Sequence, residues 1–339
     1  MCLVTNKMKP IVAKHDIYVI KELYKQYGGG YVAPYQKTPY NLNELKEAEG
    51  KDDSKVSETE KRQICAGYIH AHTTVTGGNK HGFIAYIPAG TEFYIDDDFD
   101  NVCAKSLFVT DEFVRDGGKA ASKENYRNLA EAILEAYLDH ETKIGYYVMP
   151  DKSLVSPLDI TDEQKGKAIA VVVKYDKKTG ERLAWALEQR DLAWCNNYYK
   201  HLQIGIRVAW SSSKKEAIAC KGTEKCMAEV LNNEDYKKTP EDFPAFKYVS
   251  EFATEGTEAG DWNMDAPGVL FDVAMDGMTV ANAVMLYTGF GTLIYGWYWS
   301  SAENLQNSAW YCNTDYATVG NGLKRGSGYV RPSLALAAA

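Results

Sequence analysis

The sequence predicts an α+β protein in which a helix connects a β-rich N-terminal domain to a mixed C-terminal domain. Residues 1–116 contain short apolar and aromatic runs separated by turn residues, which is typical of a β-rich domain. Residues 117–143 carry the clearest helical pattern of the chain, and residues 144–336 mix strand and helix signals. With 339 residues, 45% of them hydrophobic, the chain is long enough to form two cores.

Charge and hydropathy exclude two classes of partner. The formal net charge is -8, and Lys and Arg do not cluster anywhere without acidic neighbours. Nucleic acid and anionic membrane surfaces are therefore not expected partners. The N-terminal residues lack the apolar core of a signal peptide, and no eighteen apolar residues run together. We therefore expect cytoplasmic synthesis without a signal peptide and no membrane insertion, and we interpret residues 337–339 as cloning residue.

The cysteines are scattered along the chain and odd in number, which does not indicate a disulfide framework. The seven are Cys2, Cys65, Cys103, Cys195, Cys220, Cys226 and Cys312. Reduced thiols are the expectation. Cys220 and Cys226 bracket a short polar loop, so these two could pair in oxidising surroundings.

Within residues 1–116, the runs at 17–20, 83–87 and 93–95 predict strands. Residues 46–61 are almost wholly polar and charged, which predicts an exposed loop. The segment 122–140 predicts a helix with Ser122 as its N-cap. Its apolar face has two ways to be buried, against a neighbouring sheet or in a short bundle of several chains. That face consists of Tyr126, Leu129, Ala130, Ile133, Leu134, Tyr137 and Leu138.

Two polar clusters in the first domain have residue types that bind metal ions. His70 and His72 stand two residues apart, so on a strand they share a side, and His81 follows nearby. Such a pair could ring a metal ion if the domain were trimeric, but we expect two partly exposed strand histidines without a metal. The acidic run at 96–100 lacks the glycine and the final glutamate of a calcium-binding EF-hand loop. We therefore expect a solvated turn there, no metal site and no cofactor.

The second domain begins with a predicted hairpin at 168–187, whose turn ends in Thr179 and Gly180. The polar stretch 211–242 is compatible with helix, and 243–256 predicts a helix. The segment 296–336 is rich in Tyr, Trp, Ser, Gly and Asn and poor in charge, a composition typical of recognition surfaces. Between 295 and 316 the Tyr and Trp residues are Tyr295, Trp297, Tyr298, Trp299, Trp310, Tyr311 and Tyr316.

The order of motifs from 144 to 336 resembles the C-type-lectin-fold domain of formylglycine-generating enzymes and of variable proteins of diversity-generating retroelements. The motifs are the hairpin KAIAVVVKYDKKTGERLAWAL, GDW followed by APGVL, then YWSSAE, SAWYCN and GYVRPSLAL. The variable proteins of phages and gut bacteria are the more similar group. In that group a reverse-transcribed template turns Asn-type codons into NNC or NNT codons, which cannot encode Trp, Lys, Glu, Gln or Met. Residues 311–323 contain none of these five types.

The resemblance divides the last segment into fixed and variable positions. The fixed ones would form a structural frame, in which Arg331 and Glu303 could form a buried charge pair. Frame candidates are Trp299, Ser300, Ser301, Glu303, Trp310, Lys324, Val330, Arg331 and Pro332. Candidates for diversification and ligand contact are Asn304, Leu305, Asn307, Ser308, Tyr311, Asn313, Tyr316, Thr318, Gly320, Gly322, Leu323, Gly326, Ser327 and Tyr329. Tyr311 and Tyr316 are the expected anchors, although any one Gly or Asn here could equally serve a turn.

Departures from the related families limit the chemistry that the resemblance implies. Formylglycine-generating enzymes use a pair of active-site cysteines, whereas the C-terminal half of this domain has only Cys312. The calcium-binding tripeptides of sugar-binding lectins are missing, and Met264 interrupts the one similar stretch. No nucleophile elbow, phosphate loop or zinc-protease motif occurs. We therefore expect a binding protein and not an enzyme.

The expected function is binding of a cell-surface protein or glycan receptor on a bacterial host through a hypervariable face. The N-terminal domain would attach the chain to other proteins of a phage tail, so the expected location is the virion. A homotrimer is expected by analogy with phage receptor-binding proteins. Two alternatives stay open: an oxidase of the formylglycine-generating type or a divergent enzyme, and a structural tail component without a variable face.

Overall fold

The computed structural model describes the chain in ten stretches and divides it into two units between Leu138 and Asp139. The described residues are 11–12, 14–15, 17–24, 70–76, 80–87, 89–90, 92–93, 123–196, 213–314 and 317–338. The predicted loop at 46–61, the acidic turn at 96–100 and the Ser122 cap lie outside them.

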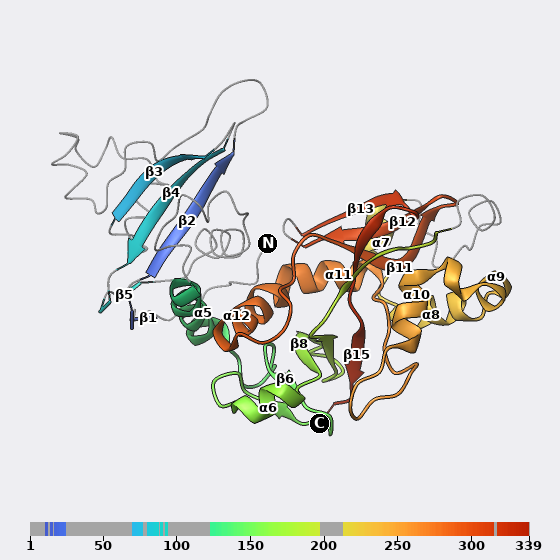
Figure 1. The fold of residues 1–339 in the computed structure, drawn as a ribbon, viewed down its shortest axis with the longest axis horizontal. Helices are drawn as coiled ribbons and strands as arrows, with labels where there is room; N and C mark the ends of the chain where they lie inside the picture. The colour runs from blue at the N-terminus through green and yellow to red at the C-terminus, as the bar shows by residue number, and fades with distance from the viewer. Residues whose placement is uncertain are drawn as a thin grey trace. The chain divides into compact units, whose positions relative to one another are not determined.

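The described residues of the first unit form two small antiparallel sheets and one helix (Figure 1). Strands β1 (Ile11–Val12) and β5 (Glu92–Phe93) form one pair. Strands β2 (Ile17–Tyr24), β3 (His70–Thr76) and β4 (Lys80–Ile87) form a three-stranded sheet in the order β2-β4-β3. The strands predicted at 17–20 and 83–87 are confirmed, and the third is a two-residue strand that ends at Phe93.

Helix α5 (Lys123–Tyr137) confirms the predicted helix and shows how its apolar face is buried. Ala130, Ile133 and Leu134 are at most 1% exposed, and α5 contacts β1 and β2. Lys14, which stands between β1 and β2, forms an ion pair with Glu131 of the helix at 3.2 Å. The helix therefore packs on strands of its own unit, which is the first of the two expected arrangements.

The histidines considered as a metal site lie on two strands of this sheet. His70 and His72 on β3 pair with Tyr86 and Ile84 of β4, and His81 on β4 pairs with Val75. In the described parts of the chain, no three His, Cys, Asp or Glu side chains are arranged to hold a metal ion.

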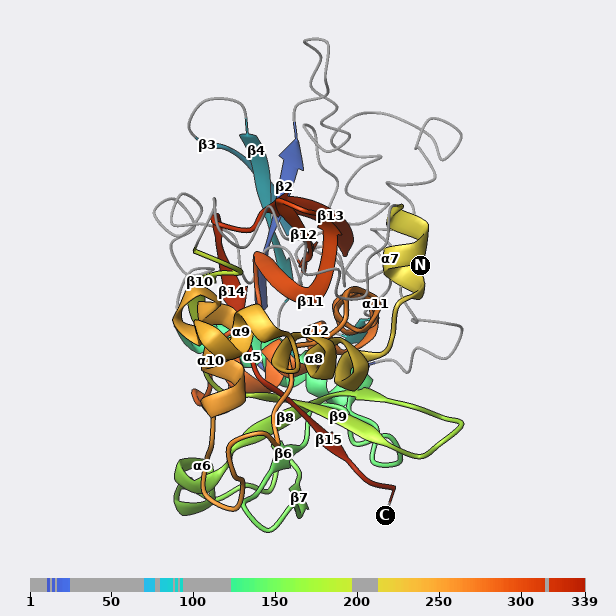
Figure 2. The same cartoon turned by 90° about the vertical axis from the view of Figure 1, so that its right-hand side faces the viewer.

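The second unit has three layers, with helices between two five-stranded sheets (Figures 1 and 2). The first sheet has the order β15-β9-β8-β6-β7, from β6 (Tyr147–Val148), β7 (Leu154–Val155), β8 (Ala170–Tyr175), β9 (Arg182–Ala186) and β15 (Ser333–Leu336). The second has the order β10-β14-β11-β12-β13, from β10 (Arg190–Ala193), β11 (Trp297–Leu305), β12 (Ser308–Asn313), β13 (Thr318–Leu323) and β14 (Ser327–Val330). All pairs are antiparallel except β11 with β14. The α+β class predicted from the sequence is confirmed.

The helical layer is built mainly from the segment before the second sheet. The described helices of the second unit, in and around this layer, are α6 (Asp162–Lys167), which lies beside the first sheet and outside the layer, α7 (Lys214–Ala219), α8 (Thr223–Leu231), α9 (Glu234–Lys238), the 3-10 turn η3 (Pro240–Asp242), α10 (Pro244–Glu251), α11 (Pro267–Asp272), the π-helical η4 (Val273–Gly277) and α12 (Met278–Thr288). Helix α11 contacts β11, β12 and β13, whereas η4 and α12 contact β8. A Cβ at Gly277 would lie 1.7 Å from the Val173 carbonyl oxygen, so only glycine allows this close approach of helix and strand. Among the described helices none is by itself long and apolar enough to span a membrane, although the pair Pro267–Met275 and Val280–Thr288, bent by 66°, meets that criterion jointly.

Local signals set several element boundaries where they were predicted. The hairpin expected at 168–187 consists of β8 and β9, and Gly180 in its turn has a φ of 77°. The helix expected at 243–256 is shorter and spans Pro244–Glu251. Proline is favoured in the first turn of a helix, and the extended backbone of Phe252 ends the helix. The polar stretch 211–242 contains three short helices and η3.

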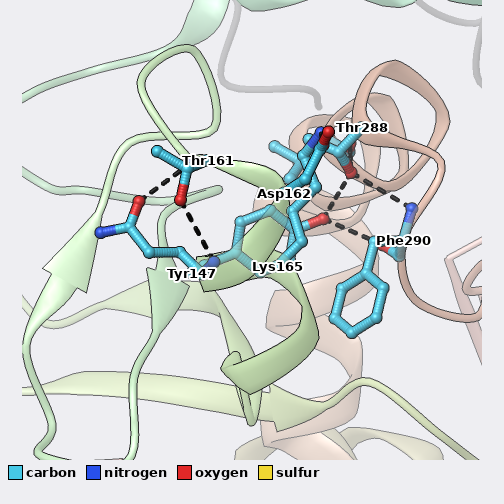
Figure 3. A network of polar contacts seen from close by, with 8 residues as sticks. Tyr147, Thr161, Asp162, Lys165, Thr288 and Phe290 are labelled. Carbon is cyan, nitrogen blue, oxygen red and sulfur yellow. Dashed lines mark hydrogen bonds and ion pairs between the residues drawn. The ribbon is translucent and has the colours of Figure 1, made fainter.

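Side-chain hydrogen bonds join the first sheet to the end of α12 (Figure 3). The Tyr147 hydroxyl bonds the Thr288 hydroxyl at 2.6 Å and donates to the Phe290 carbonyl at 2.9 Å. Nearby, Thr161 caps α6 through a reciprocal pair of bonds with Gln164. Burial raises the pKa of Tyr147 to about 12, so its hydroxyl stays protonated and remains a donor. The hydrogen bonds of Tyr147 to Thr288 and Phe290 therefore fix the loop that leads towards the second sheet.

The carboxyl group of Asp265 holds three elements together inside this unit. It accepts hydrogen bonds from the Trp185 indole on β9 at 2.7 Å, from the Ser333 hydroxyl on β15 at 2.7 Å, and from the Thr223 hydroxyl at the start of α8 at 3.4 Å. Asp265 is 1% exposed, and this burial raises its pKa to about 6. The hydrogen bonds oppose the shift but do not cancel it.

We expect Asp265 to make the protein less stable as the pH rises from about 4 to about 7. Its folded-state pKa of about 6 exceeds the ordinary 3.8, so the folded state holds the proton more tightly. The contribution of Asp265 to the free energy of unfolding is complete below the pKa of the unfolded state. It is lost as the pH rises through the pKa of the folded state, a change of about 3 kcal/mol. Relative to Asp265→Asn, wild type should therefore lose stability over this range in urea unfolding. Asp162→Asn, at an exposed position, is the control. A difference in unfolding free energy between wild type and Asp265→Asn that does not change with pH would contradict this prediction.

Candidate functional site

One face of the second sheet collects the aromatic side chains of the C-terminal segment. Trp297 and Trp299 are two residues apart on β11, and Trp299 pairs with Tyr311 on β12, so all three lie on the same face. The Tyr311 ring meets Trp297 edge-on at 4.4 Å and Trp299 at 6.0 Å between centroids. Trp297 is 48% exposed. We call these three side chains the aromatic cluster.

A hollow of about 410 Å³ adjoins the aromatic cluster. The cluster forms one side of it, and residues of β13, β14 and the turn between them form the other. Besides the cluster, its lining consists of Gly322, Leu323, Gly326, Ser327 and Gly328. The walls are mainly apolar, and Leu323 is 45% exposed at the rim. Such a hollow suits an apolar or planar group of a ligand.

Glycines on the neighbouring strands allow the aromatic rings to lie against the backbone. A Cβ at Gly320 would lie 2.7 Å from the Tyr311 hydroxyl oxygen, and one at Gly328 would lie 2.8 Å from the Trp299 indole nitrogen. A Cβ at Gly322 would meet the Tyr311 ring at 3.2 Å. These glycines therefore serve ring packing on strands and not only turn geometry, so a residue change at 320 or 322 also moves Tyr311.

We expect Gly320→Ala to displace the Tyr311 ring and destabilise the protein by about 1–3 kcal/mol, because an added methyl group overpacks this contact. Near-ultraviolet circular dichroism should report the ring movement, and denaturant unfolding should report the loss. Gly166→Ala in α6 is the matched control, because nothing lies within 4 Å of its added Cβ. That variant should be unchanged or slightly more stable. Equal effects of the two substitutions would refute the packing role of Gly320.

Every expected frame residue is buried beneath or beside this face. The exposed fraction does not exceed 4% for Trp299, Ser300, Ser301, Glu303, Trp310, Val330, Lys324 and Arg331, and Pro332 is also buried. Trp299 donates from its indole nitrogen to the Leu192 carbonyl at 3.1 Å, and the Ser300 hydroxyl donates to the Trp310 carbonyl at 2.8 Å. The frame thus ties β11 to both β10 and β12.

The buried charge pair of the frame joins Glu303 to Lys324, and the predicted pair of Glu303 with Arg331 is wrong. Both side chains of the observed pair are 1% exposed. The Lys324 ammonium also donates to the Gln306 carbonyl at 3.0 Å and lies 4.5 Å from the centre of the Trp194 ring. Burial lowers the pKa of Lys324, while Glu303 opposes that shift. The pair fixes the β11–β12 turn against the end of β13.

Arg331 instead fixes the loop that leads into β11. Its Nη2 atom donates to the Thr292 carbonyl at 2.6 Å and to the Gln189 side chain at 2.7 Å. The same Gln189 oxygen accepts a hydrogen bond from the Tyr298 hydroxyl. Burial lowers the pKa of the guanidinium, but arginine remains charged in proteins. Neutral acceptors, not a carboxylate, therefore hold Arg331 and so position the strand that carries Trp297.

The fourteen candidate contact residues divide by exposure. The exposed ones are Leu305, Asn307, Thr318, Leu323 and Ser327, and the half-buried ones are Tyr311, Gly320, Gly322, Gly326 and Tyr329. Asn304, Ser308 and Asn313 are at most 6% exposed, and the Ser308 hydroxyl bonds the Asn304 side chain at 3.1 Å. Their burial places these three with the frame and not on the surface. Tyr316 lies outside the described residues.

Trp297 was not among the candidate contact residues, because a Trp codon cannot arise by the diversification expected here. Strand alternation could have found it, since it stands two residues before Trp299 and precedes the buried run of β11. Tyr295, also 40% exposed, packs edge-on against Tyr329 at 5.5 Å. Aromatic residues outside the candidate set, Tyr295 and Trp297, therefore contribute to this surface.

Cys312, the cysteine on which an oxidase alternative depends, lies inside the sheet. It is 0% exposed, and burial raises its pKa to about 12. A buried thiol of this kind is a poor nucleophile. The position of Cys312 gives no support to a reactive role.

No family model matches the chain, and no curated protein matches it. A fimbrial protein from Bacteroides ovatus ATCC 8483, whose crystal structure is known, is similar with a TM-score of 0.44 and 14% identity. The similarity covers 56% of this chain and 48% of the fimbrial protein, so the chain spans about half of that protein's length.

Proposed function

We propose that this chain is a receptor-binding protein whose ligand site is the aromatic face of the β10–β14–β11–β12–β13 sheet. The ligand is a cell-surface protein or glycan of a bacterial host. Diversification of the exposed positions by a retroelement would retarget the site, and the chain would act from a phage tail.

The observation that carries this proposal is the separation of frame from surface. The residues assigned to the frame are all buried, whereas ten of the fourteen candidate contact residues are exposed or half-buried. Five of these ten line the hollow beside Trp297 and Trp299: Tyr311, Gly322, Leu323, Gly326 and Ser327. Aromatic residues on a rigid scaffold dominate contact energies in many interfaces. Side chains at the rim can therefore change while the sheet stays intact.

We further propose that the second unit has a C-type lectin fold. In support of this, β15 near the end of the chain pairs with β9 of the first sheet. The segment that carries the site therefore leaves the first sheet after β9 and returns to it at β15. The first unit would attach the chain to other tail proteins, and a homotrimer is the proposed assembly. Size-exclusion chromatography with light scattering tests that assembly directly.

Sequencing the 3′ end of the gene in several isolates tests the diversification. Substitutions should be confined to NNC or NNT codons and should fall at exposed positions such as Leu305, Asn307 and Thr318. Codons for the frame residues Glu303 and Lys324 should stay constant. Uniform sequences, with no reverse-transcriptase gene beside this one, would sink the retroelement hypothesis. A static binding face would remain testable by the Trp297 variant discussed below.

A further inference from the structure

Cys220 and Cys226 stand apart from the proposed binding face but close to each other. Cys220 ends α7, where its amide donates to the carbonyls of Glu216 and Ala217, and Cys226 lies in α8. Their sulfur atoms are 4.0 Å apart. A disulfide bond needs about 2.05 Å between the sulfurs. The remaining gap is within reach of side-chain rotation at Cys220, which follows the last residue of its helix.

The two thiols differ in access and in acidity. Cys220 is half-buried, whereas Cys226 is 1% exposed. The hydrogen bond between them lowers the pKa of Cys220 and raises the pKa of Cys226. Cys220 is therefore the accessible thiolate, and Cys226 lies behind it as a protonated thiol. This is the division of roles that thiol–disulfide exchange requires.

We propose that Cys220 and Cys226 form a reversible disulfide, with Cys220 as the attacking and Cys226 as the resolving cysteine. The oxidant is a small-molecule disulfide such as oxidised glutathione. The Cys220 thiolate attacks one sulfur of glutathione disulfide, the S–S bond breaks, and one glutathione leaves as a thiolate. Cys226 then loses its proton and attacks the Cys220 sulfur, and the second glutathione leaves. Two protein thiols are oxidised, and one glutathione disulfide becomes two thiols that take up the released protons.

The site of this bond is connected to the scaffold of the second sheet. The Gly268 amide donates to the Cys220 carbonyl at 2.9 Å, and the Lys221 ammonium donates to the Gly268 carbonyl at 2.6 Å. Thr223 accepts from the Ala266 amide at 3.0 Å. The loop between the cysteines therefore holds the start of α11, which contacts β11, β12 and β13. Oxidation would close this loop covalently under the sheet. The inference does not depend on the proposed ligand.

The test uses the full chain, equilibrated with oxidised glutathione, quenched with N-ethylmaleimide and digested with trypsin without reduction. Because trypsin cuts after Lys215, Lys221 and Lys225, the disulfide should appear in mass spectra as peptide 216–221 linked to peptide 226–237. Dithiothreitol should separate the two peptides. Cys312, which is 0% exposed, is the internal control and should stay unmodified.

Two single variants test the order of attack. Cys226→Ser should leave Cys220 as a stable glutathione adduct, because no resolving thiol remains. Cys220→Ser should leave Cys226 unmodified, because its sulfur is shielded. Absence of the linked peptide from oxidised wild type would overturn the proposal. So would a glutathione adduct that forms as fast on Cys226 in Cys220→Ser as on Cys220 in Cys226→Ser.

Discussion

Replacing Lys324 with methionine is expected to destabilise the protein by about 3–5 kcal/mol, because it leaves the Glu303 carboxylate buried without its cation. Both side chains are 1% exposed, so water cannot replace the lost partner. Denaturant unfolding should show a lower midpoint at an unchanged slope. The shift in Tm should be on the order of 10 °C for a unit of this size.

Two comparisons distinguish loss of the buried pair from loss of any ion pair. Lys167→Met breaks the exposed pair with Glu163 at 2.7 Å and should leave the midpoint unchanged. The double variant Glu303→Leu with Lys324→Met removes both charges and should recover most of the stability. If Lys324→Met were as stable as wild type, the pair would not hold the β11–β12 turn. The frame would then have to rest on the tryptophans and Arg331.

Replacing Trp297 with alanine is expected to weaken receptor binding by about 2 kcal/mol or more, roughly thirty-fold, while Tm changes little. Trp297 is 48% exposed beside the hollow, so its indole is available to a ligand and contributes little to the core. Binding of the labelled chain to bacterial host cells, measured by flow cytometry, gives the affinity. Thermal unfolding of the same samples gives Tm.

Leu158→Ala is the matched control for Trp297→Ala. Leu158 is also an exposed apolar side chain, at 44%, but it follows β7 in the first sheet, away from the aromatic cluster. The Leu158→Ala variant should bind host cells as the wild type does. Equal loss in both variants would mean that general stickiness causes the binding, and no loss in either would remove the aromatic cluster from the site. Tyr311→Ala is less selective, because the ring packs on Gly320 and Gly322 and its removal should also lower Tm.

Elements that depend on local signals could be predicted well from the sequence. The apolar repeat of α5 and the hairpin of β8 and β9 were both predictable, because periodicity and turn glycines act over a few residues. The burial of Trp299 and Trp310 also followed from residue type, since a large ring gains most by leaving water. Residue type and local periodicity therefore predict these elements and the burial of the two tryptophans.

Contacts between distant segments could not be predicted in this way. Glu303 pairs with Lys324 and not with Arg331, because the β11–β12 turn lies beside the end of β13, whereas Arg331 is drawn towards Gln189 and the loop before β11. All three residues have the same chemistry in either arrangement. Only the order of strands in the sheet decides which charge meets which.

The sequence by itself determined the α+β class and the aromatic content of the last segment, because these depend on residue type and short-range periodicity, whereas the frame residues were expected from the resemblance to known families. The tertiary structure decided which face the aromatic residues share and which polar positions are buried. Asn304, Ser308 and Asn313 are polar residue types that commonly lie on a surface, yet each is at most 6% exposed. Exposure is a property of the assembled sheet, since it depends on which neighbours cover each side chain.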